Sequence, residues 1–167
     1  MTEFTAWQRR SPEEAALLNP AFLAMVLVHG VQGYEKEIGL PMPFPLLFLV
    51  PPVVLINSTR DALPGRKDSS FAAWIQKHPN ERLRFAEVAA SLVPVVRESV
   101  VFAISHGALE IEKASVKALQ LPRGTSARLS ETTHDIQAIL KKAHFVGKWY
   151  ANAGTVETIM SLWGVRP

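Results

Sequence analysis

The chain of 167 residues combines 48% hydrophobic with 20% charged residues, which excludes a disordered protein and predicts one domain with a buried core. Cysteine is absent, which excludes disulfides, thiolate metal sites and a cysteine nucleophile. The formal net charge of +3 is uneven: residues 1–56 hold three basic and five acidic side chains (−2), and residues 57–167 hold fifteen and ten (+5). We therefore expect any anionic partner to bind the second part.

Two apolar stretches in the first third of the chain do not predict a membrane protein. Residues 20–31 and 44–56 are apolar, but each is shorter than the roughly twenty residues that a spanning helix needs. The second stretch is also interrupted by prolines. The first twenty residues do not have the basic-then-apolar pattern of a signal peptide. We expect a cytoplasmic protein without a membrane partner.

Helices dominate the predicted elements, beginning with two near the N-terminus. Residues 11–18 open with Ser, Pro and two Glu, which is typical of the start of a short helix. Asn19-Pro20 repeats this signal and predicts a helix over 20–36. Because that helix is apolar on nearly all sides, we expect it at the centre of the core. Its two glycines, Gly30 and Gly33, predict the close approach of another backbone.

Four segments follow in the middle of the chain. Residues 46–56 are nearly all apolar, so they predict either a buried strand or a buried helix; the double proline favours a helix broken near Pro51. Residues 58–61 predict a single helical turn, and residues 71–78 a short helix. The longest predicted helix covers 80–106, with apolar residues at steps of three and four and a proline that bends it.

The last third predicts a hairpin followed by helices. Residues 109–121 alternate around a turn at Lys113-Ala114-Ser115, which is typical of a small β-hairpin. Residues 122–129 predict a loop. A further helix follows to Tyr150, and Thr155 caps a last short helix.

Together these elements predict a mainly α (α+β) fold, a compact helical domain with one small β-hairpin. The single domain comprises an N-terminal arm or short helix (1–18), a helical core (19–107), the hairpin (108–121) and C-terminal helices (122–167). A long helix followed by a hairpin is also the order found in a winged helix–turn–helix, so a winged-helix-like arrangement is one interpretation. A structural hairpin that covers the core is the other. The long helix offers few side chains that could read bases.

The sequence contains no recognisable catalytic or metal-binding motif. Pro64-Gly65-Arg66-Lys67 is not a phosphate-binding loop, and no nucleophile elbow is present. The five histidines never fall at the spacing of a helical metal pair. Ser105 and His106 are adjacent, so on a helix they point about 100° apart. We expect no catalytic, cofactor-binding or metal-binding residues, and no enzyme.

Several short segments, in order along nearly the whole chain, resemble one family. They are Asn19-Pro20-Ala21-Phe22, residues 40–50, residues 58–64, Phe71 with Trp74, Arg82 with Phe85, Arg97-Glu98, residues 102–107, Gly147-Lys148-Trp149 and residues 162–167. The family that they resemble is the small middle component of bacterial three-component conflict systems, which are built around an ABC-type ATPase of the Rad50/SMC-like kind. The pattern departs from the family at Pro51-Pro52.

The resemblance brings no catalytic residues and no cofactor. It implies a non-enzymatic adaptor that links the ABC-type ATPase to an effector protein in defence against phage or other foreign DNA. A small winged-helix-type DNA-binding protein is the alternative function. The oligomeric state, the effector and the trigger are left open.

A partner-docking surface is predicted on the last two helices. Phe145 and Trp149 are four residues apart, so they stack on a second apolar face of their helix. Leu162 and Trp163 would join them after the chain reverses at Gly154. The competing interpretation is that the final helix folds over this face and completes the core.

A weak, non-specific contact with duplex DNA is predicted through the basic second part of the chain. The residues are Arg123, Arg128, Lys141, Lys142 and Lys148. Lys141 and Lys148 are seven residues apart and share a helix face. The alternative is a solvated basic surface that only keeps the protein soluble.

Overall fold

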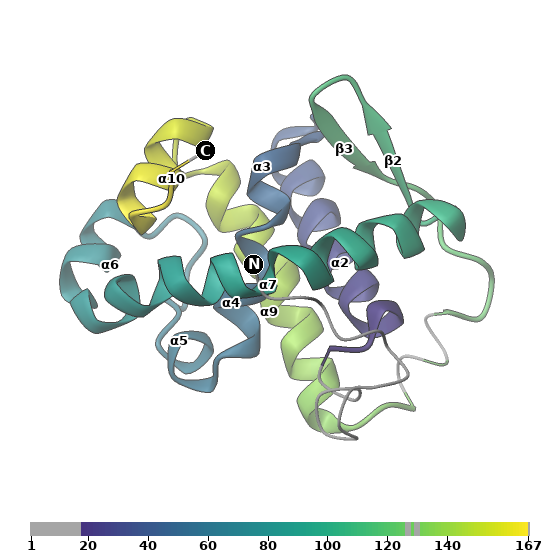
Figure 1. Cartoon of the computed structure of the whole chain (residues 1–167), viewed down its shortest axis with the longest axis horizontal. Coiled ribbons are helices and arrows are strands. Elements are labelled where there is room, and N and C mark those ends of the chain that lie inside the picture. Colours follow the sequence, from purple (N-terminus) through teal and green to yellow (C-terminus); the bar gives the residue numbers. More distant parts are fainter. Residues whose placement is uncertain (1–17, 126–127, 129–130, 167) are drawn as a thin grey trace.

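The computed structural model describes residues 18–125, 128 and 131–166. In chain order, its elements are α2 (Pro20–Ile38), β1 (Met42–Pro43), α3 (Phe44–Leu47), α4 (Val50–Leu55), α5 (Asn57–Asp61), α6 (Phe71–Lys77), α7 (Pro79–Ser105), β2 (Leu109–Glu112), β3 (Ser115–Ala118), α9 (His134–Ala151) and α10 (Val156–Trp163). The fold is mainly helical with one small antiparallel sheet (Figure 1), which confirms the predicted fold class. Of the helix predicted over residues 11–18, only Leu18 lies within the described residues.

Helix α2 is the central element, as its apolar composition predicts. Leu23, Leu27 and Val31 are fully buried, and the helix contacts α4, α7 and α9. Its start is defined by Asn19, whose side-chain oxygen accepts a hydrogen bond of 2.9 Å from the backbone N–H of Ala21. Gly39, with φ of 70°, ends it in the left-handed conformation.

Helices α2 and α9 approach each other through glycines. A Cβ atom on Gly33 would overlap the backbone carbonyl of His144, and one on Gly147 would overlap the backbone carbonyl of Gly30. No side chain fits at Gly33 or Gly147 unless one helix moves. The close backbone approach predicted at Gly30 and Gly33 is therefore confirmed, with α9 as the partner helix. The missing side chain of Gly30 itself leaves room for Val50 of α4, whose methyl groups would lie 3.2 Å from a Cβ there.

The apolar segment 46–56 is helical, so the strand interpretation is wrong. The break that was expected near Pro51 falls just before it, between α3 and α4. Pro51 and Pro52 lie in the first turn of α4, where backbone N–H groups have no partner within the helix and proline costs no hydrogen bond. Both prolines are buried, and the helix remains intact after them.

The predicted hairpin is confirmed and gains a third strand. Strand order is β1-β3-β2, with Leu109 opposite Ala118 and Met42 opposite Val116. Strand β1 lies in a proline-rich segment, with Pro41, Pro43 and Pro45, for which the sequence predicts no strand. It pairs with β3 because Met42 is fully buried against the core while Phe44 N–H bonds to the Ala114 carbonyl (3.0 Å).

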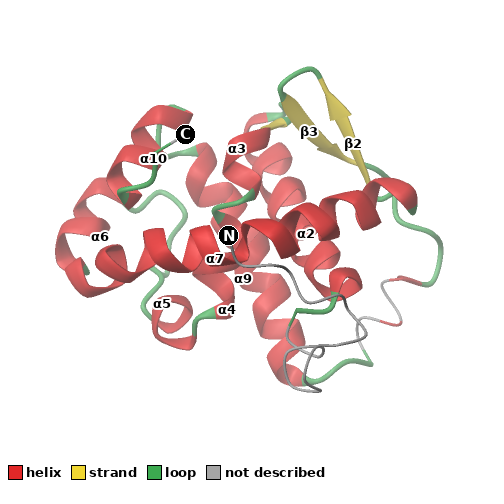
Figure 2. Cartoon of the chain, in the orientation of Figure 1, coloured by secondary structure: helices red, strands yellow, loops and turns green. Residues whose placement is uncertain are grey.

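Helix α7 runs across the molecule from α6 to the hairpin, in front of α2, α4 and α9 (Figure 2). Its N-cap is His78, two residues before the predicted cap Asn80, so the helix begins at Pro79; Gly107, with φ of 66°, follows its end as predicted. Among the described residues it is the one helix long and apolar enough to cross a membrane, and 33% of its most apolar window is buried. Core helices of soluble proteins also meet this criterion.

We expect Gly147→Ala to destabilise the protein by about 1–3 kcal/mol or more, because the new methyl group must push α2 and α9 apart. For a chain of this size, that corresponds to a fall in Tm of several degrees, measured by thermal denaturation.

Gly65→Ala is the matched control, because a Cβ at Gly65 meets nothing within 4 Å. We expect an unchanged or slightly raised Tm for this variant. Equal melting temperatures for the Gly147 and Gly65 variants would contradict the close helix contact.

Candidate interaction surfaces

An aromatic cluster joins four helices at the end of the molecule where the chain terminates. Its members come from α6, α7, α9 and α10 and are Phe71, Trp74, Phe85, Trp149, Tyr150 and Trp163. Phe71 lies edge-on to Trp149 and Trp163, with ring centroids 4.8 and 5.5 Å apart. Phe85 stacks on Trp163 at 3.8 Å. These contacts hold α10 against the rest of the domain.

The polar atoms of the aromatic cluster are all hydrogen-bonded. Trp163 Nε1–H donates to the Tyr150 hydroxyl, and this hydroxyl donates to the Leu49 carbonyl, each at 2.9 Å. Trp149 Nε1–H donates to the Ser69 carbonyl at 2.9 Å. Burial raises the pKa of the Tyr150 phenol far above its usual value, so the phenol stays protonated. Through these hydrogen bonds, α9 is held to two segments that are distant in sequence, at Leu49 and at Ser69.

The expected docking surface on the last two helices is not an exposed patch. Trp149 and Trp163 are 0% exposed, and Phe145 and Leu162 are half-buried. Burial of this face agrees with the competing interpretation, but α6 provides the cover: Phe71 and Trp74 pack against Trp149.

Helix α10 follows the turn at Gly154, which has φ of 105°, and the Thr155 cap, and it packs against α6 and α7. It reaches α9 through the hydrogen bond from Trp163 to Tyr150.

The residues predicted to contact DNA are arranged along α9 and the segment before it. Arg123, Arg128 and Lys141 are exposed, whereas Lys142 and Lys148 are half-buried. The ammonium group of Lys142 lies 5.8 Å from the ring centroid of Phe145, a favourable cation–π position. DNA binding by these residues stays a prediction.

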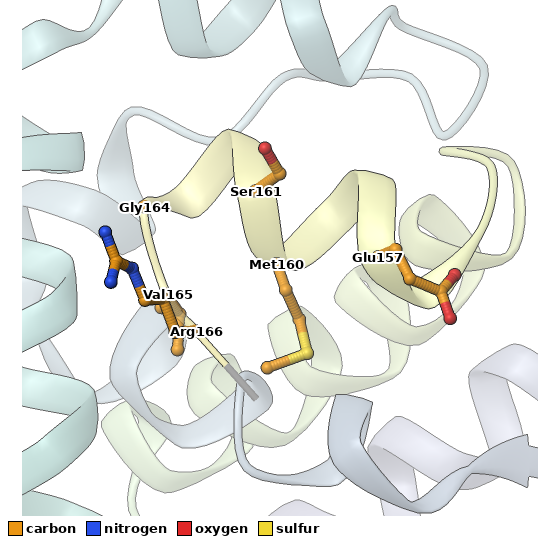
Figure 3. A pocket seen from close by; sticks show the side chains of 6 residues that line it. All are labelled: Glu157, Met160, Ser161, Gly164, Val165 and Arg166. Atoms are coloured by element: carbon orange, nitrogen blue, oxygen red, sulfur yellow. The ribbon is translucent and has the colours of Figure 1, made fainter.

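An open hollow lies beside the C-terminal helix (Figure 3). It has a volume of about 400 Å³ and is lined by Glu157, Met160, Ser161, Gly164, Val165 and Arg166. Met160 lies between Glu157 on one side and Arg166 on the other. The opposite charges flank an apolar floor, but nothing in the described chain converges on one polar point in the hollow.

Ser105 and His106 are both engaged with the last turn of α7. The Ser105 hydroxyl donates to the Val101 carbonyl at 2.6 Å, and His106 Nδ1 bonds the Phe102 carbonyl at 2.8 Å. They therefore do not act on one another. Within the part of the chain that the structure describes, no three His, Asp or Glu side chains gather in a group that could hold a metal ion.

Two histidines lie at the contact between α2 and α9. His29 Nδ1–H donates to the Met25 carbonyl at 2.8 Å, as expected for a hydrogen-bonded histidine on the central helix. Burial lowers the pKa of His29, against an opposing effect of this hydrogen bond. Burial also lowers the pKa of His144, and the positive charges of Lys148, His29 and Lys36 lower it further. Both imidazoles are thus held neutral.

The exposed side of α7 carries apolar residues for which the sequence predicted no role. Leu83, Val101 and Ile104 are 76%, 64% and 40% exposed, although all three are apolar residues of the longest helix. They share the three- and four-residue spacing of the core residues on the same helix. A second row of apolar residues at this spacing, on another side of the helix from the core residues, is the sequence pattern that indicates such a surface.

A comparison with family models identifies the class of protein. Residues 7–167 match the model for the ABC-three component (ABC-3C) system Middle Component 3. The chain therefore belongs to this family of middle components, and the resemblance found in the sequence is confirmed. As a component of a multi-component system, it has partner proteins. Searches of curated proteins and of solved structures find no match.

We expect Trp163→Ala to lower the free energy of unfolding by about 3–5 kcal/mol, because it removes a fully buried indole and leaves a cavity. Trp149→Ala should have a similar effect. Phe145→Ala, which truncates a half-buried neighbour on the same helix, is the control and should cost clearly less. Chemical denaturation measures all three, and near-native stability of both Trp variants would contradict their place in the core.

Stability should also fall on mild acidification. Because the pKa values of His29 and His144 are lower in the folded than in the unfolded chain, their contribution is complete above about pH 6.5 and is lost as the pH falls below it. We expect a lower Tm at about pH 5.5 than at about pH 7.5. The double variant His29→Gln/His144→Gln should show a smaller difference.

The exposed His134 in the first turn of α9 provides the control for this pH dependence. His134→Gln should retain the wild-type difference in Tm. An identical difference in the double variant would show that the pair at the α2–α9 contact is not responsible.

Proposed function

We propose that this protein is a non-enzymatic adaptor that couples an ABC-type ATPase to an effector protein in a bacterial system of defence against phage or other foreign DNA. The observation that carries the proposal is the match of residues 7–167 to a middle component of an ABC three-component system. A middle component works beside an ATPase and a third protein, and a chain of this size offers them surfaces rather than a reaction centre.

The packing of the described residues is consistent with a surface-based function. The aromatic cluster and the glycine contact fill the interior, and each buried side-chain N or O atom in the described chain has a hydrogen-bond partner. Ser105 and His106 are engaged with their own helix. The polar groups thus contribute to the fold, and we place the protein in the cytoplasm, where an ATP-driven system acts.

Co-purification with the ATPase encoded beside this protein tests the adaptor function. We expect the two chains, co-expressed with one tag on the ATPase, to elute together, and the isolated adaptor to show no ATP turnover. An ABC-type ATPase from an unrelated system is the control and should not retain the adaptor. ATP hydrolysis that stays with the isolated chain through repeated purification would contradict the proposal.

The same experiment separates the adaptor from the alternative, a small winged-helix-type DNA-binding protein. A complex bridged by DNA is lost after nuclease treatment and weakens steeply with added salt, because phosphate contacts release counterions. We expect the complex to survive both treatments. Its loss under both would favour DNA contact through Arg123, Arg128, Lys141, Lys142 and Lys148.

A further inference from the structure

Helix α7 carries a continuous exposed seam on the side that faces away from α2. The seam consists of Leu83, Glu87, Ala90, Pro94, Arg97, Val101 and Ile104, and all seven are exposed. Their spacing alternates strictly between four and three residues. This is the spacing of the a and d positions of a coiled coil, which place side chains on one narrow face over several turns. The seam therefore has the geometry of a helix–helix contact surface that no described element covers.

The seam carries large apolar side chains near its two ends and small side chains at its centre. Leu83 and Val101 are 76% and 64% exposed, an unusual exposure for apolar residues at coiled-coil spacing. Between them, Ala90 and Pro94 provide small side chains that let a second helix approach. Apolar surface at coiled-coil spacing gains free energy when a partner helix covers it.

Six of the seven seam residues are self-complementary in order, and the seventh, Ile104, lies opposite Asn80. When two copies of α7 pack antiparallel about a two-fold axis at residue 92, Leu83 faces Val101 of the other copy, and Ala90 faces Pro94. Each pair joins an a position to a d position, as antiparallel coiled coils do. In such a symmetric contact each pairing occurs twice, once on either side of the axis.

The two charged residues of the seam also match in this antiparallel arrangement. In the same register Glu87 faces Arg97 of the other copy, so two opposite-charge pairs form. Within the described chain, neither Glu87 nor Arg97 has an ion-pair partner. A parallel pairing would instead place Glu87 against Glu87 and Arg97 against Arg97, which repel. The charges thus favour one orientation of one partner, a second copy of this chain.

We propose that the protein forms a two-fold symmetric dimer through an antiparallel contact of the α7 seams. Leu83 and Val101 lie about 27 Å apart along the helix axis, so the contact is a single helix pair, smaller than a typical stable interface. The dimer is therefore weak and depends on protein concentration. This inference is independent of the adaptor function, which concerns other proteins.

Sedimentation velocity of the full-length protein over about two orders of magnitude in concentration tests the dimer. We expect a monomer–dimer equilibrium. Arg97→Glu and Glu87→Arg should each weaken dimerisation at least about tenfold, because each places two like-charge pairs at the contact. The double variant Glu87→Arg/Arg97→Glu restores both pairs with exchanged signs and should recover the dimer.

Lys77→Glu, a charge reversal at an exposed position of α6 outside the seam, is the control and should leave the equilibrium unchanged. Circular dichroism melts verify that each variant folds, which is expected since the substituted side chains are exposed. A protein that stays monomeric at all concentrations overturns the proposal, as does a double variant no better than the single ones. Single variants that lose binding to the ATPase or to lipid vesicles, without a change in self-association, assign the seam to that other partner.

Discussion

The close contact between α2 and α9 is the constraint on which the rest of the structure depends. Gly33 lies against the backbone of His144 and Gly147 against the backbone of Gly30, two contacts about one helical turn apart. They set the distance between α9 and the central helix at this crossing. On the α9 held in this way, Trp149 points away from α2 and meets Phe71 of α6, and Tyr150 bonds to Trp163 of α10. The helix placed by the glycine contact thus carries two members of the aromatic cluster.

The aromatic cluster in turn explains why the end of the chain belongs to the core. Trp163 stacks on Phe85 of α7 and donates to the Tyr150 hydroxyl, and Arg82 Nε–H donates to the Leu162 carbonyl at 2.7 Å. One side of α7 therefore packs against α10 and against the central helices. Its other side, the seam, leaves Leu83, Val101 and Ile104 exposed.

These features suit a protein that acts through contacts. Membership in the middle-component family implies partner proteins, and partners need surfaces that are separate from the core. The C-terminal aromatic residues, which are attractive interface anchors in the sequence, serve the fold instead. Exposed features that could serve association include the α7 seam, the hollow beside α10 and the basic residues along α9. Self-association through the seam would leave the latter two free for other proteins.

The sequence by itself determined the elements whose signals are local. Asn19 marks the start of α2, alternation defines the hairpin, and Gly30 and Gly33 require a close neighbour, because caps, pleating and the absence of a Cβ act over a few residues. The predicted end of α2 is residue 36, whereas the helix continues to Ile38. Tertiary structure decided what each apolar face meets. The face with Phe145 and Trp149 predicts burial or docking equally well until α6 is placed against Trp149, and β1 is a strand only because β3 lies beside it. On α7, core stripe and seam have the same spacing, since helical periodicity records that a face is apolar but not which neighbour covers it.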